Sequence, residues 1–531
     1  MIENHLILAI GLLLVVLILI MVSNKLGISS AIFLVIAGSL ISLIPGVPAL
    51  RLEPELLFIV ILPPLLYRAA WNTCWKDFWA NRRPISLHGF GLVVVTAGGI
   101  GLLTHFLIPN FSLALGFLLG SIVAPPDALA ATSVLQQLKI PKRIVTILEG
   151  ESLVNDAASL ILYRFAVAAV VSGQFSLGEA STEFIFASLS GIGIGCGIAA
   201  ILYLVHRFLP TNASIDTVVS VASPYLMYLT AEKLEASGVL AVVSGGFFLS
   251  YHSSKTLTSQ ARLQMLGVWE TLVFVLNGVV FIVVGLQLPL IVEKLGDISL
   301  PKAILLGFAI SVVVMLIRML WIFPATYLPR FFDKKLRKND PYPGWQSVFL
   351  MGWCGMRGIV TLASALTIPL LLADGTTFPF RSLILFEAFT VIIFTLVFQG
   401  LSLPYLIRRL GIMVPAKEEI ENSELVTHLA GIALGRIMDN YGEEALGCAP
   451  FVRQREKYER LAKVRVRDSV NDPDKPGSPL TLEKYHQMKR EIIAVRREEL
   501  SKLRSRNIYS DELIRRKEFE LDLEQISIGF S

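Results

Sequence analysis

Apolar residues fill the first 410 positions of the chain in long runs, which short polar connections separate. A helix needs about 20 mainly apolar residues to cross the hydrocarbon core of a bilayer. By this measure the pattern predicts thirteen spanning helices, of which the second, eighth and ninth are short. Their expected ranges are 6–22, 30–44, 55–71, 86–108, 111–135, 145–172, 182–207, 215–231, 237–251, 267–291, 302–328, 346–371 and 381–407.

Charged residues are concentrated on the C-terminal side of this apolar region. Residues 411–531 hold 43 of the 89 charged residues of the chain, and their apolar positions recur at helical spacing. The sequence therefore predicts an all-α polytopic membrane protein with a transmembrane domain over 1–410 and a helical cytoplasmic tail over 411–531. The tail helices are expected at 418–447, 451–468, 482–507 and 511–525, with a linker at 471–479.

Composition agrees with a membrane protein and excludes other classes. Hydrophobic residues make up 54% of the chain and charged residues 17%, which is below the quarter typical of soluble domains. The two signs of charge nearly balance in the tail, so the net charge of +5 indicates no nucleic-acid partner. The four cysteines have neither paired nor metal-ligand spacing, so we expect no disulfide, zinc site or cofactor.

The loops between the spans predict the orientation. Cytoplasmic loops are enriched in Lys and Arg. With the N-terminus outside, the inside loops carry 15 such residues and the outside loops about five. We therefore expect an external N-terminus and a cytoplasmic tail. No basic residue precedes 6–22 and no convincing cleavage site follows it, which favours a first spanning helix over a signal peptide.

A polar cluster opens the sixth span. Glu151 and Ser152 precede Asn155 and Asp156 by three to five residues on a helix, so the four share one broad face. A charge at the centre of a spanning helix costs about 2.5–3.5 kcal/mol even on insertion-based scales. Such a cluster persists where it faces protein, water or an ion, and we interpret this one as an ion site.

Two other spans contain helix breakers beside charged residues. Pro125 and Pro126 precede Asp127 in the fifth span, where they remove backbone donors and leave carbonyl groups free. In the twelfth span, Gly355 and Gly358 flank Arg357, with Gly352 one turn earlier. A single break is most often an ordinary kink. Two breaks beside charges at membrane depth favour a binding site.

The chemistry of the cluster centres on Asp156. Burial in a low dielectric disfavours the charged form of a carboxyl group, so a proton and a cation compete for its oxygens. Hard cations such as Na⁺ take oxygen ligands, as Ca²⁺ and Mg²⁺ do. Asp127 can supply a second carboxylate or hold the broken helix ends. Ser152, Thr132 and the carbonyls near Pro125 and Pro126 can complete an oxygen cage.

Glu151 needs a partner, because an uncompensated buried charge is strongly destabilising. Arg318 in the eleventh span and Arg357 in the twelfth are the available cations. We favour Arg318 for Glu151 and expect Arg357 to stabilise the interrupted helix. Asp156 then remains as the one exchangeable acid beside the uncharged Asn155, and exchanging one proton for one monovalent cation moves no net charge.

Other ionisable residues within spans are expected to have structural roles. Arg68 is expected to reach the interface or pair with a carboxylate. His88, Glu270 and Glu387 are expected to be interfacial or satisfied within the helix bundle.

The run Glu149-Gly-Glu-Ser-Leu-Val-Asn-Asp156, together with the Pro-Asp break and the later Gly-Met-Arg-Gly, resembles the NhaP/NHE-type cation:proton antiporters, in particular their bacterial branch with a long tail. The resemblance covers about residues 1–410. It implies inverted repeats, two crossed broken helices, a homodimer in the bacterial inner membrane and electroneutral exchange by alternating access. It places the essential acid on Asp156, the cation-coordinating serine on Ser152 and the structural acid on Glu151.

The resemblance also extends to the remaining site residues. It assigns the neutral neighbour of the essential acid to Asn155, the acid of the fifth-helix break to Asp127, and the in-membrane arginines to Arg318 and Arg357. Two departures concern the cavity mouth. Pro126 stands where relatives often have Thr or Val, and Tyr67-Arg68 stands where an acidic residue is frequent.

The favoured function is exchange of cytoplasmic Na⁺ for external H⁺, serving pH and sodium homeostasis. K⁺/H⁺ exchange is the main rival, and Li⁺ is a further substrate to consider. A remote alternative is an intramembrane aspartyl protease using Asp127 and Asp156, but the chain lacks the Gly-x-Gly-Asp setting of that enzyme. A passive channel would not need a titratable acid. The role of the tail, regulatory or dimer-packing, stays open.

Overall fold

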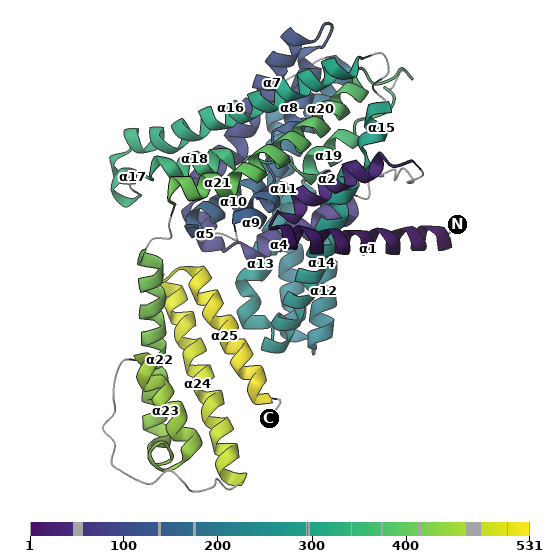
Figure 1. The fold of residues 1–531 in the computed structure, drawn as a ribbon. Helices are drawn as coiled ribbons and strands as arrows, with labels where there is room; N and C mark the ends of the chain where they lie inside the picture. The colour runs from purple at the N-terminus through teal and green to yellow at the C-terminus, as the bar shows by residue number, and fades with distance from the viewer. Residues whose placement is uncertain are drawn as a thin grey trace. The chain divides into compact units, whose positions relative to one another are not determined.

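The computed structural model describes residues 2–45, 57–135, 140–173, 177–293, 295, 298–340, 342–372, 375–412, 416–462, 479–506 and 508–529. In these residues the regular secondary structure is helical, apart from one isolated β-bridge between Leu371 and Thr377. The expected all-α class is confirmed. The chain divides into two compact units, shown as ribbons in Figure 1.

The first unit comprises Met1–Pro210, Thr217–His252 and Gly267–Met413. Its helices, with η marking π-helical turns, are α1 (Ile2–Leu26), α2 (Ser30–Ser42), η1 (Leu57–Ile61), α4 (Leu62–Asn72), α5 (Trp75–Ala80), α6 (Arg82–Ser86), η2 (Leu87–Leu92), α7 (Val93–Leu107), α8 (Leu113–Val123), α9 (Ala128–Leu135), α10 (Lys142–Ser172), α11 (Leu177–Phe208), α12 (Ala213–Lys233), α13 (Gly238–Thr256), α14 (Ser259–Leu286), α15 (Leu288–Glu293), α16 (Leu300–Phe332), α17 (Lys334–Asn339), α18 (Trp345–Trp353), α19 (Ile359–Leu366), α20 (Arg381–Phe394), η3 (Thr395–Gln399) and α21 (Gly400–Leu410).

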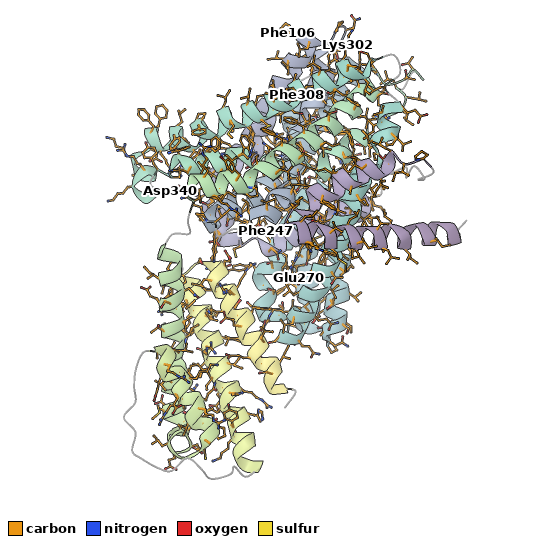
Figure 2. The ribbon with its side chains drawn as sticks, viewed as in Figure 1. Phe106, Phe247, Glu270, Lys302, Phe308 and Asp340 are labelled. Atoms are coloured by element: carbon orange, nitrogen blue, oxygen red, sulfur yellow. The ribbon has the colours of Figure 1, made fainter. Side chains whose placement is uncertain are left out.

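Seven helical stretches in the described part of the chain are long and apolar enough to cross a bilayer. Shorter apolar helices at Ser30–Ser42, Leu57–Asn72 and Leu113–Val123 fall on three further expected spans. The total of thirteen crossings stays a prediction. Outward-facing apolar side chains such as Phe106 and Phe308 are exposed (Figure 2), as expected of surfaces that face lipid.

Small residues let the helices of the first unit approach closely. A Cβ on Gly116 of α8 would lie 2.6 Å from the carbonyl oxygen of Gly101 on α7. One turn along, a Cβ on Gly120 would lie 2.5 Å from the carbonyl oxygen of Ala97. Side chains of any size would force these helices apart, so the glycines fix their contact.

Both expected helix breaks are present. The first lies between α8 and α9, where Ala124, Pro125, Pro126 and Asp127 are not helical. The second lies between α18 and α19, over residues 354–358. By contrast, the Leu62-Pro63-Pro64 run does not break a helix. Its prolines lie in the first turn of α4, which continues directly from the π-helical turn η1, so the helical backbone runs on through them.

The second unit comprises Thr211–Asp216, Ser253–Leu266 and Val414–Ser531. It contains the first residues of α12, the end of α13 and the start of α14. Its remaining helices are α22 (Ala416–Gly447), α23 (Ala449–Ala462), α24 (Pro479–Arg506) and α25 (Asp511–Gly529). Two apolar clusters form its core, one around Phe451 and Tyr458 and one around Leu500 and Leu521. Most of the expected linker, residues 471–478, lies outside the described residues, as do residues 463–468 of the expected second tail helix.

An ion-pair network joins the segments of the second unit. The Asp522 carboxylate on α25 accepts hydrogen bonds from Arg262, at the start of α14, and from Arg497 on α24. Ser259 donates a hydrogen bond of 3.0 Å to Gln525 beside this pair. The first turns of α14 are therefore attached to the C-terminal helices by charge-assisted hydrogen bonds, which are stronger than neutral ones.

Candidate ion-binding site

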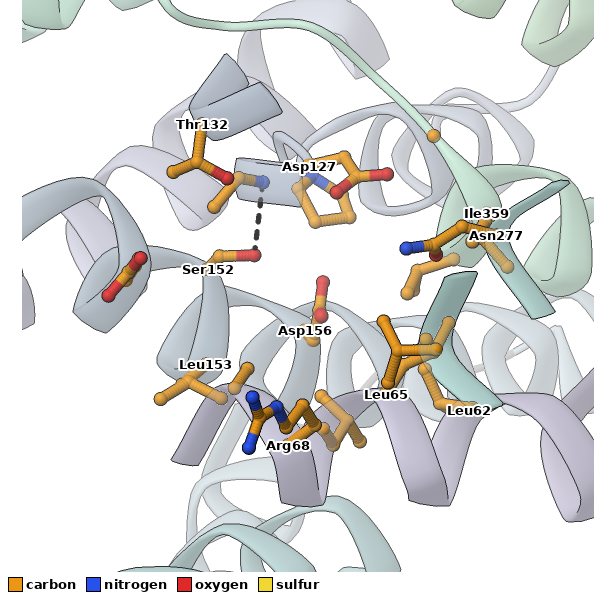
Figure 3. A pocket seen from close by; sticks show the side chains of 18 of the residues that line it. Leu62, Leu65, Arg68, Asp127, Thr132, Ser152, Leu153, Asp156, Asn277 and Ile359 are labelled. Atoms are coloured by element: carbon orange, nitrogen blue, oxygen red, sulfur yellow. Dashed lines mark hydrogen bonds between the residues drawn. The ribbon is translucent and has the colours of Figure 1, made fainter. Parts of the chain in front are cut away.

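A cavity of about 490 Å³ is lined by both helix breaks and by helices α4, α10 and α14. Figure 3 shows its polar side chains converging from these elements. The polar and charged residues in its wall are Arg68, Asn72, Asp127, Thr132, Glu149, Ser152, Asp156, Glu270, Asn277 and Thr361. Four predicted ligands, Asp127, Thr132, Ser152 and Asp156, thus line one space.

Asp156 is the acid at the centre of this wall. It is only 7% exposed, and its carboxylate points into the cavity (Figure 3). Within the described residues this carboxylate makes no hydrogen bond or ion pair. It lies in the same cavity as Asp127, close enough for the two carboxylates to repel each other. A cation or a proton would relieve that repulsion.

The neighbours of Asp156 on α10 hold the first break in place. The Ser152 hydroxyl oxygen accepts a hydrogen bond of 3.3 Å from the backbone N–H of Ala128, the first residue of α9. The Asn155 amide donates one of 3.4 Å to the carbonyl oxygen of Pro126. This carbonyl, which the sequence offers as a free ligand, is therefore engaged by Asn155. Ser152 keeps a lone pair for a cation, because a hydroxyl oxygen has two.

The two breaks contact each other directly. The backbone N–H of Asp127 donates a hydrogen bond of 2.6 Å to the carbonyl oxygen of Met356. Gly358 packs against the Asp127 side chain, and a Cβ on Gly358 would overlap the Asp127 carboxylate. Only glycine fits at this close approach.

Arg357 stabilises the end of α8. Its guanidinium donates to the carbonyl oxygens of Val123, at 3.0 Å, and Ala124, at 3.4 Å, and also to that of Gly355. The last carbonyls of a helix have no partner within the helix and carry its negative dipole end. The fully buried Arg357 supplies both the donors and the compensating charge.

The partner of Glu151 is Arg318. The guanidinium of Arg318 on α16 engages both carboxylate oxygens of Glu151, with Nη2 at 3.1 Å from Oε2. It also donates to the carbonyl oxygen of Met351 on α18, at 3.1 Å. Both side chains are buried, so the pair links α10, α16 and α18 inside the protein.

Two ionisable residues differ from their expected surroundings. His88 is neither interfacial nor satisfied: it is buried with Nδ1 at 3.7 Å from Glu151, and its ring nitrogens have no hydrogen-bond partner in the described chain. Glu387 on α20 is also buried, and neither carboxylate oxygen has a hydrogen-bond partner among the described residues. Apolar neighbours in sequence do not show how deeply a residue lies in the helix bundle, because the faces of one helix are buried to different extents.

Six polar or charged cavity residues were not predicted as part of the site, and three of them stand out. Asn277 on α14 and Thr361 on α19 line the cavity, and their side-chain oxygens have no hydrogen-bond partner in the described chain. Arg68 also faces the cavity, with Nη2 at 4.0 Å from Glu270. An amide in the apolar run of α14 was the available signal for Asn277. The contacts of Thr361 and Arg68 depend on helix packing.

This arrangement can bind a small cation. Four carboxylates, three hydroxyls and two amides line this one cavity, and hard monovalent cations prefer such oxygen ligands. No His, Cys, Asp and Glu cluster suited to a transition metal occurs among the described residues.

Residues 11–409 match the family model described as "Sodium/hydrogen exchanger, transmembrane". The chain belongs to the sodium/hydrogen exchanger family. It is 36% identical over 365 residues to the sodium, potassium, lithium and rubidium/H⁺ antiporter of Bacillus subtilis. That match covers 67% of this chain but only 54% of the relative, so the chain spans about half the length of this curated exchanger.

Other members of the exchanger family extend the comparison. An uncharacterized Na⁺/H⁺ exchanger of Mycobacterium tuberculosis is 30% identical over 509 residues, covering 94% of this chain and 91% of the relative. The sodium proton antiporter MjNhaP1 of Methanocaldococcus jannaschii has a similar structure, with a TM-score of 0.59 at 16% identity. That likeness covers 76% of this chain and 99% of the other, and it shows a shared polytopic fold.

Proposed function

We propose that this protein exchanges cytoplasmic Na⁺ for external H⁺, with Asp156 binding the two ions in turn. The observation that carries the proposal is the buried Asp156 carboxylate, which has no hydrogen-bond or ion-pair partner among the described residues and faces a cavity lined by both helix breaks. Asp127, Ser152 and Thr132 supply further oxygen atoms in the same wall. Membership in the exchanger family favours this reading over the protease and channel alternatives.

Exchange follows from competition at one carboxylate. Burial disfavours an uncompensated charge, so Asp156 holds either a proton or a cation. The cavity has α10 and the breaks on one part of its wall and α4 and α14 on another. Relative movement of these two parts would open Asp156 to each side of the membrane in turn. Transport then needs no energy source beyond the two ion gradients.

The charge balance of the site supports one-for-one exchange. Arg318 neutralises Glu151, and Asn155 carries no charge. Asp127 is bound at the break through its backbone and packs on Gly358, so we assign it a fixed negative charge that attracts the cation. Glu149 and Glu270 also line the cavity, and we propose that Asp156 alone among these acids changes its protonation during the cycle. One proton replaces one monovalent cation, and the cycle moves no net charge.

The first prediction concerns Asp156 itself. Asp156→Asn should abolish Na⁺-dependent proton movement in everted vesicles, because an amide cannot exchange a proton in this pH range. Glu387→Gln is the matched control, since it makes the same change at a buried carboxyl outside the cavity. Near-normal fluorescence dequenching after Na⁺ addition to vesicles that contain the Asp156→Asn variant would contradict the proposal.

The second prediction concerns stoichiometry. In proteoliposomes the Na⁺-driven exchange rate should not change when valinomycin and K⁺ gradients set different membrane potentials. One-for-one exchange moves no net charge, so the potential does no work on the cycle. A rate that rises or falls steadily with the imposed potential would show that a second charge moves.

A second candidate substrate is K⁺. The relative from Bacillus subtilis is named for sodium, potassium, lithium and rubidium, and the uncharged cavity oxygens do not by themselves select Na⁺. Exchange rates measured with Na⁺, Li⁺ and K⁺ over a pH series distinguish Na⁺ from K⁺ as the preferred substrate. A higher apparent affinity for K⁺ than for Na⁺ would replace the substrate assignment and leave the antiport mechanism in place.

We also propose a homodimer in the bacterial inner membrane, with an external N-terminus and a cytoplasmic tail. The excess of basic residues in the expected inside loops supports this orientation. Protease added to everted vesicles, which present the cytoplasmic face, should cleave the tail. Protection of the tail in everted vesicles would contradict the orientation, and a monomer after cross-linking in intact membranes would contradict the dimer.

A further inference from the structure

A second cavity, of about 640 Å³, lies at the ends of α10 and α16. Its wall comes from the connection between α5 and η2, the first turn of α10, the last turns of α16, and α17 with the residues after it. Seven of its residues are charged, five of them basic: Arg82, Arg83, Arg143, Arg330, Lys335, Asp333 and Asp340. None belongs to the ion site described above.

The two carboxylates do not neutralise this wall. Asp340, which follows α17 (Figure 2), accepts two hydrogen bonds from Arg143, at 2.6 and 2.7 Å, and one from Arg330, at 2.5 Å. One carboxylate therefore serves two guanidinium groups. These hydrogen bonds, Arg143 first, hold the pKa of Asp340 below its ordinary value. The pair of arginines keeps a surplus positive charge.

Three further cations add to the surplus. Arg83 approaches the Asp333 carboxylate only to 3.7 Å. Arg82 donates to the backbone carbonyl of Trp79 at 2.9 Å and lies over its ring. Lys335 uses its backbone N–H, not its ammonium, to contact Asp333, and its ammonium makes no ion pair within the described chain. Positive charge with spare donors thus remains around the cavity.

The chemistry of this wall fits a phosphate group. Arginine forks match the oxygen atoms of phosphate, and lysine adds a point charge. The volume falls within the roughly 300–1,000 Å³ of small-molecule sites. Large apolar side chains adjoin the cavity in sequence and are exposed, among them Trp79, Leu328, Phe331 and Phe332. These side chains would contact the acyl chains of a lipid, whereas a free anion has no apolar part for them to contact.

We propose that this cavity binds the phosphate of an anionic membrane lipid at the expected cytoplasmic face. Basic pockets between spanning helices on that face are suited to lipid head groups, and the anionic leaflet attracts them. The bound phosphate would contact the α5–α6 connection and the end of α16, which also carries Arg318. The proposal is independent of the transported ion, because no residue of the transport site takes part.

The test uses the full chain reconstituted in nanodiscs and two triple variants. The cavity variant combines Arg82→Gln, Arg83→Gln and Lys335→Gln, and it leaves the Asp340 network intact. The control combines Lys334→Gln, Arg337→Gln and Lys338→Gln, which remove an equal charge from α17 residues outside the cavity wall. Native mass spectrometry then measures retention of phosphatidylglycerol against phosphatidylcholine. Inorganic phosphate is added as a competitor.

Wild-type protein and the control should retain phosphatidylglycerol over phosphatidylcholine, and the cavity variant should bind it at least about tenfold more weakly. Equal losses in both variants would overturn the proposal in favour of general surface charge. Equal retention of the two lipids would also overturn it. Full displacement by millimolar inorganic phosphate would reassign the cavity to a free anion. Thermal melting of each variant verifies that it is folded.

Discussion

Arg68 places a positive charge in the wall of a cavity proposed to bind cations. Its side chain is 13% exposed, and its ion-pair partner Glu270 is 65% exposed and 4.0 Å away. Solvent screens such an exposed carboxylate, so it compensates Arg68 only in part. Unit charges interact by about 4 kcal/mol at 4 Å for an effective dielectric constant of 20, and less at greater distance. Arg68 should therefore weaken cation binding.

The third prediction follows from this charge. Arg68→Gln should lower the apparent KM for Na⁺ by about three- to tenfold, because about 0.7–1.4 kcal/mol of repulsion is removed. The maximal rate should change less. Arg164→Gln is the control: Arg164 lies on α10 and pairs with Glu232 at 2.6 Å, outside the ion cavity. An unchanged or higher KM for Arg68→Gln would show that Arg68 does not act on the bound cation.

Residue types and spacing suffice to single out Asp156 and to narrow the partner of Glu151 to two arginines. Helical periodicity places the acids on one face, and the cost of buried charge demands a partner. The same reasoning cannot place His88, Asn277 or Thr361. Each contacts groups more than 60 residues away or lines a space built from several helices. Such contacts depend on how helices pack, which spacing along one helix does not specify.

At the scale of helices, the two breaks act as one structural element. Arg357 from the second break caps α8 of the first, and Asp127 of the first bonds Met356 of the second. Proline and glycine positions predict where each helix is interrupted. They do not reveal that the loose ends satisfy each other, because the hydrogen bonds join residues more than 200 positions apart.

The fourth prediction tests this contact. Gly358→Ala should reduce exchange by at least about tenfold, because its Cβ would overlap the Asp127 carboxylate and move it out of place. The control is Gly352→Ala in the same span, whose Cβ would meet the flexible side chain of Met319. Exchange is measured per folded protein after size-exclusion chromatography. Equal activity of Gly358→Ala and wild type would mean that the position of Asp127 does not matter.

At the scale of the whole molecule, the second unit contains a partly buried acid that should make its stability depend on pH. Glu518 on α25 faces Arg504, at 3.2 Å, and interacts with Arg262, Arg515 and Asp511. Burial raises the pKa of Glu518 above its ordinary value of 4.5, and this outweighs the attraction of Arg504. The folded state therefore holds the proton more tightly than the unfolded state.

The fifth prediction gives the direction in which the stability of α25 changes with pH. As pH rises above 4.5, the unfolded state releases the Glu518 proton first, so α25 should open more readily until Glu518 is ionised in the folded state as well. Glu518→Gln should flatten this dependence. Hydrogen exchange of residues 511–529 in the full chain, corrected for intrinsic rates, measures it. Glu512→Gln, an exposed change on the same helix, serves as control, and an unchanged slope in Glu518→Gln would contradict the assignment.

The overall class and family are accessible from the sequence, since hydropathy and motif both run along the chain. It is harder to predict from the sequence which segments make up the second unit. Residues 253–266 form the end of α13 and the start of α14, yet they belong with the C-terminal helices, where Arg262 pairs with Asp522, 260 residues later. Alternating charges in a tail are usually solvated, and only the folded arrangement shows which of them are buried as pairs.

The Glu151–Arg318 pair also sets an order of events during synthesis. The two residues are 167 positions apart, and α10 leaves the ribosome before α16. At roughly 5–20 residues per second, Glu151 waits on the order of 10–30 s for its partner. During that interval water, a proton or a neighbouring helix must satisfy its carboxyl group. Insertion of α16 then brings Arg318 to an acid that is already in place, which joins α16 to α10.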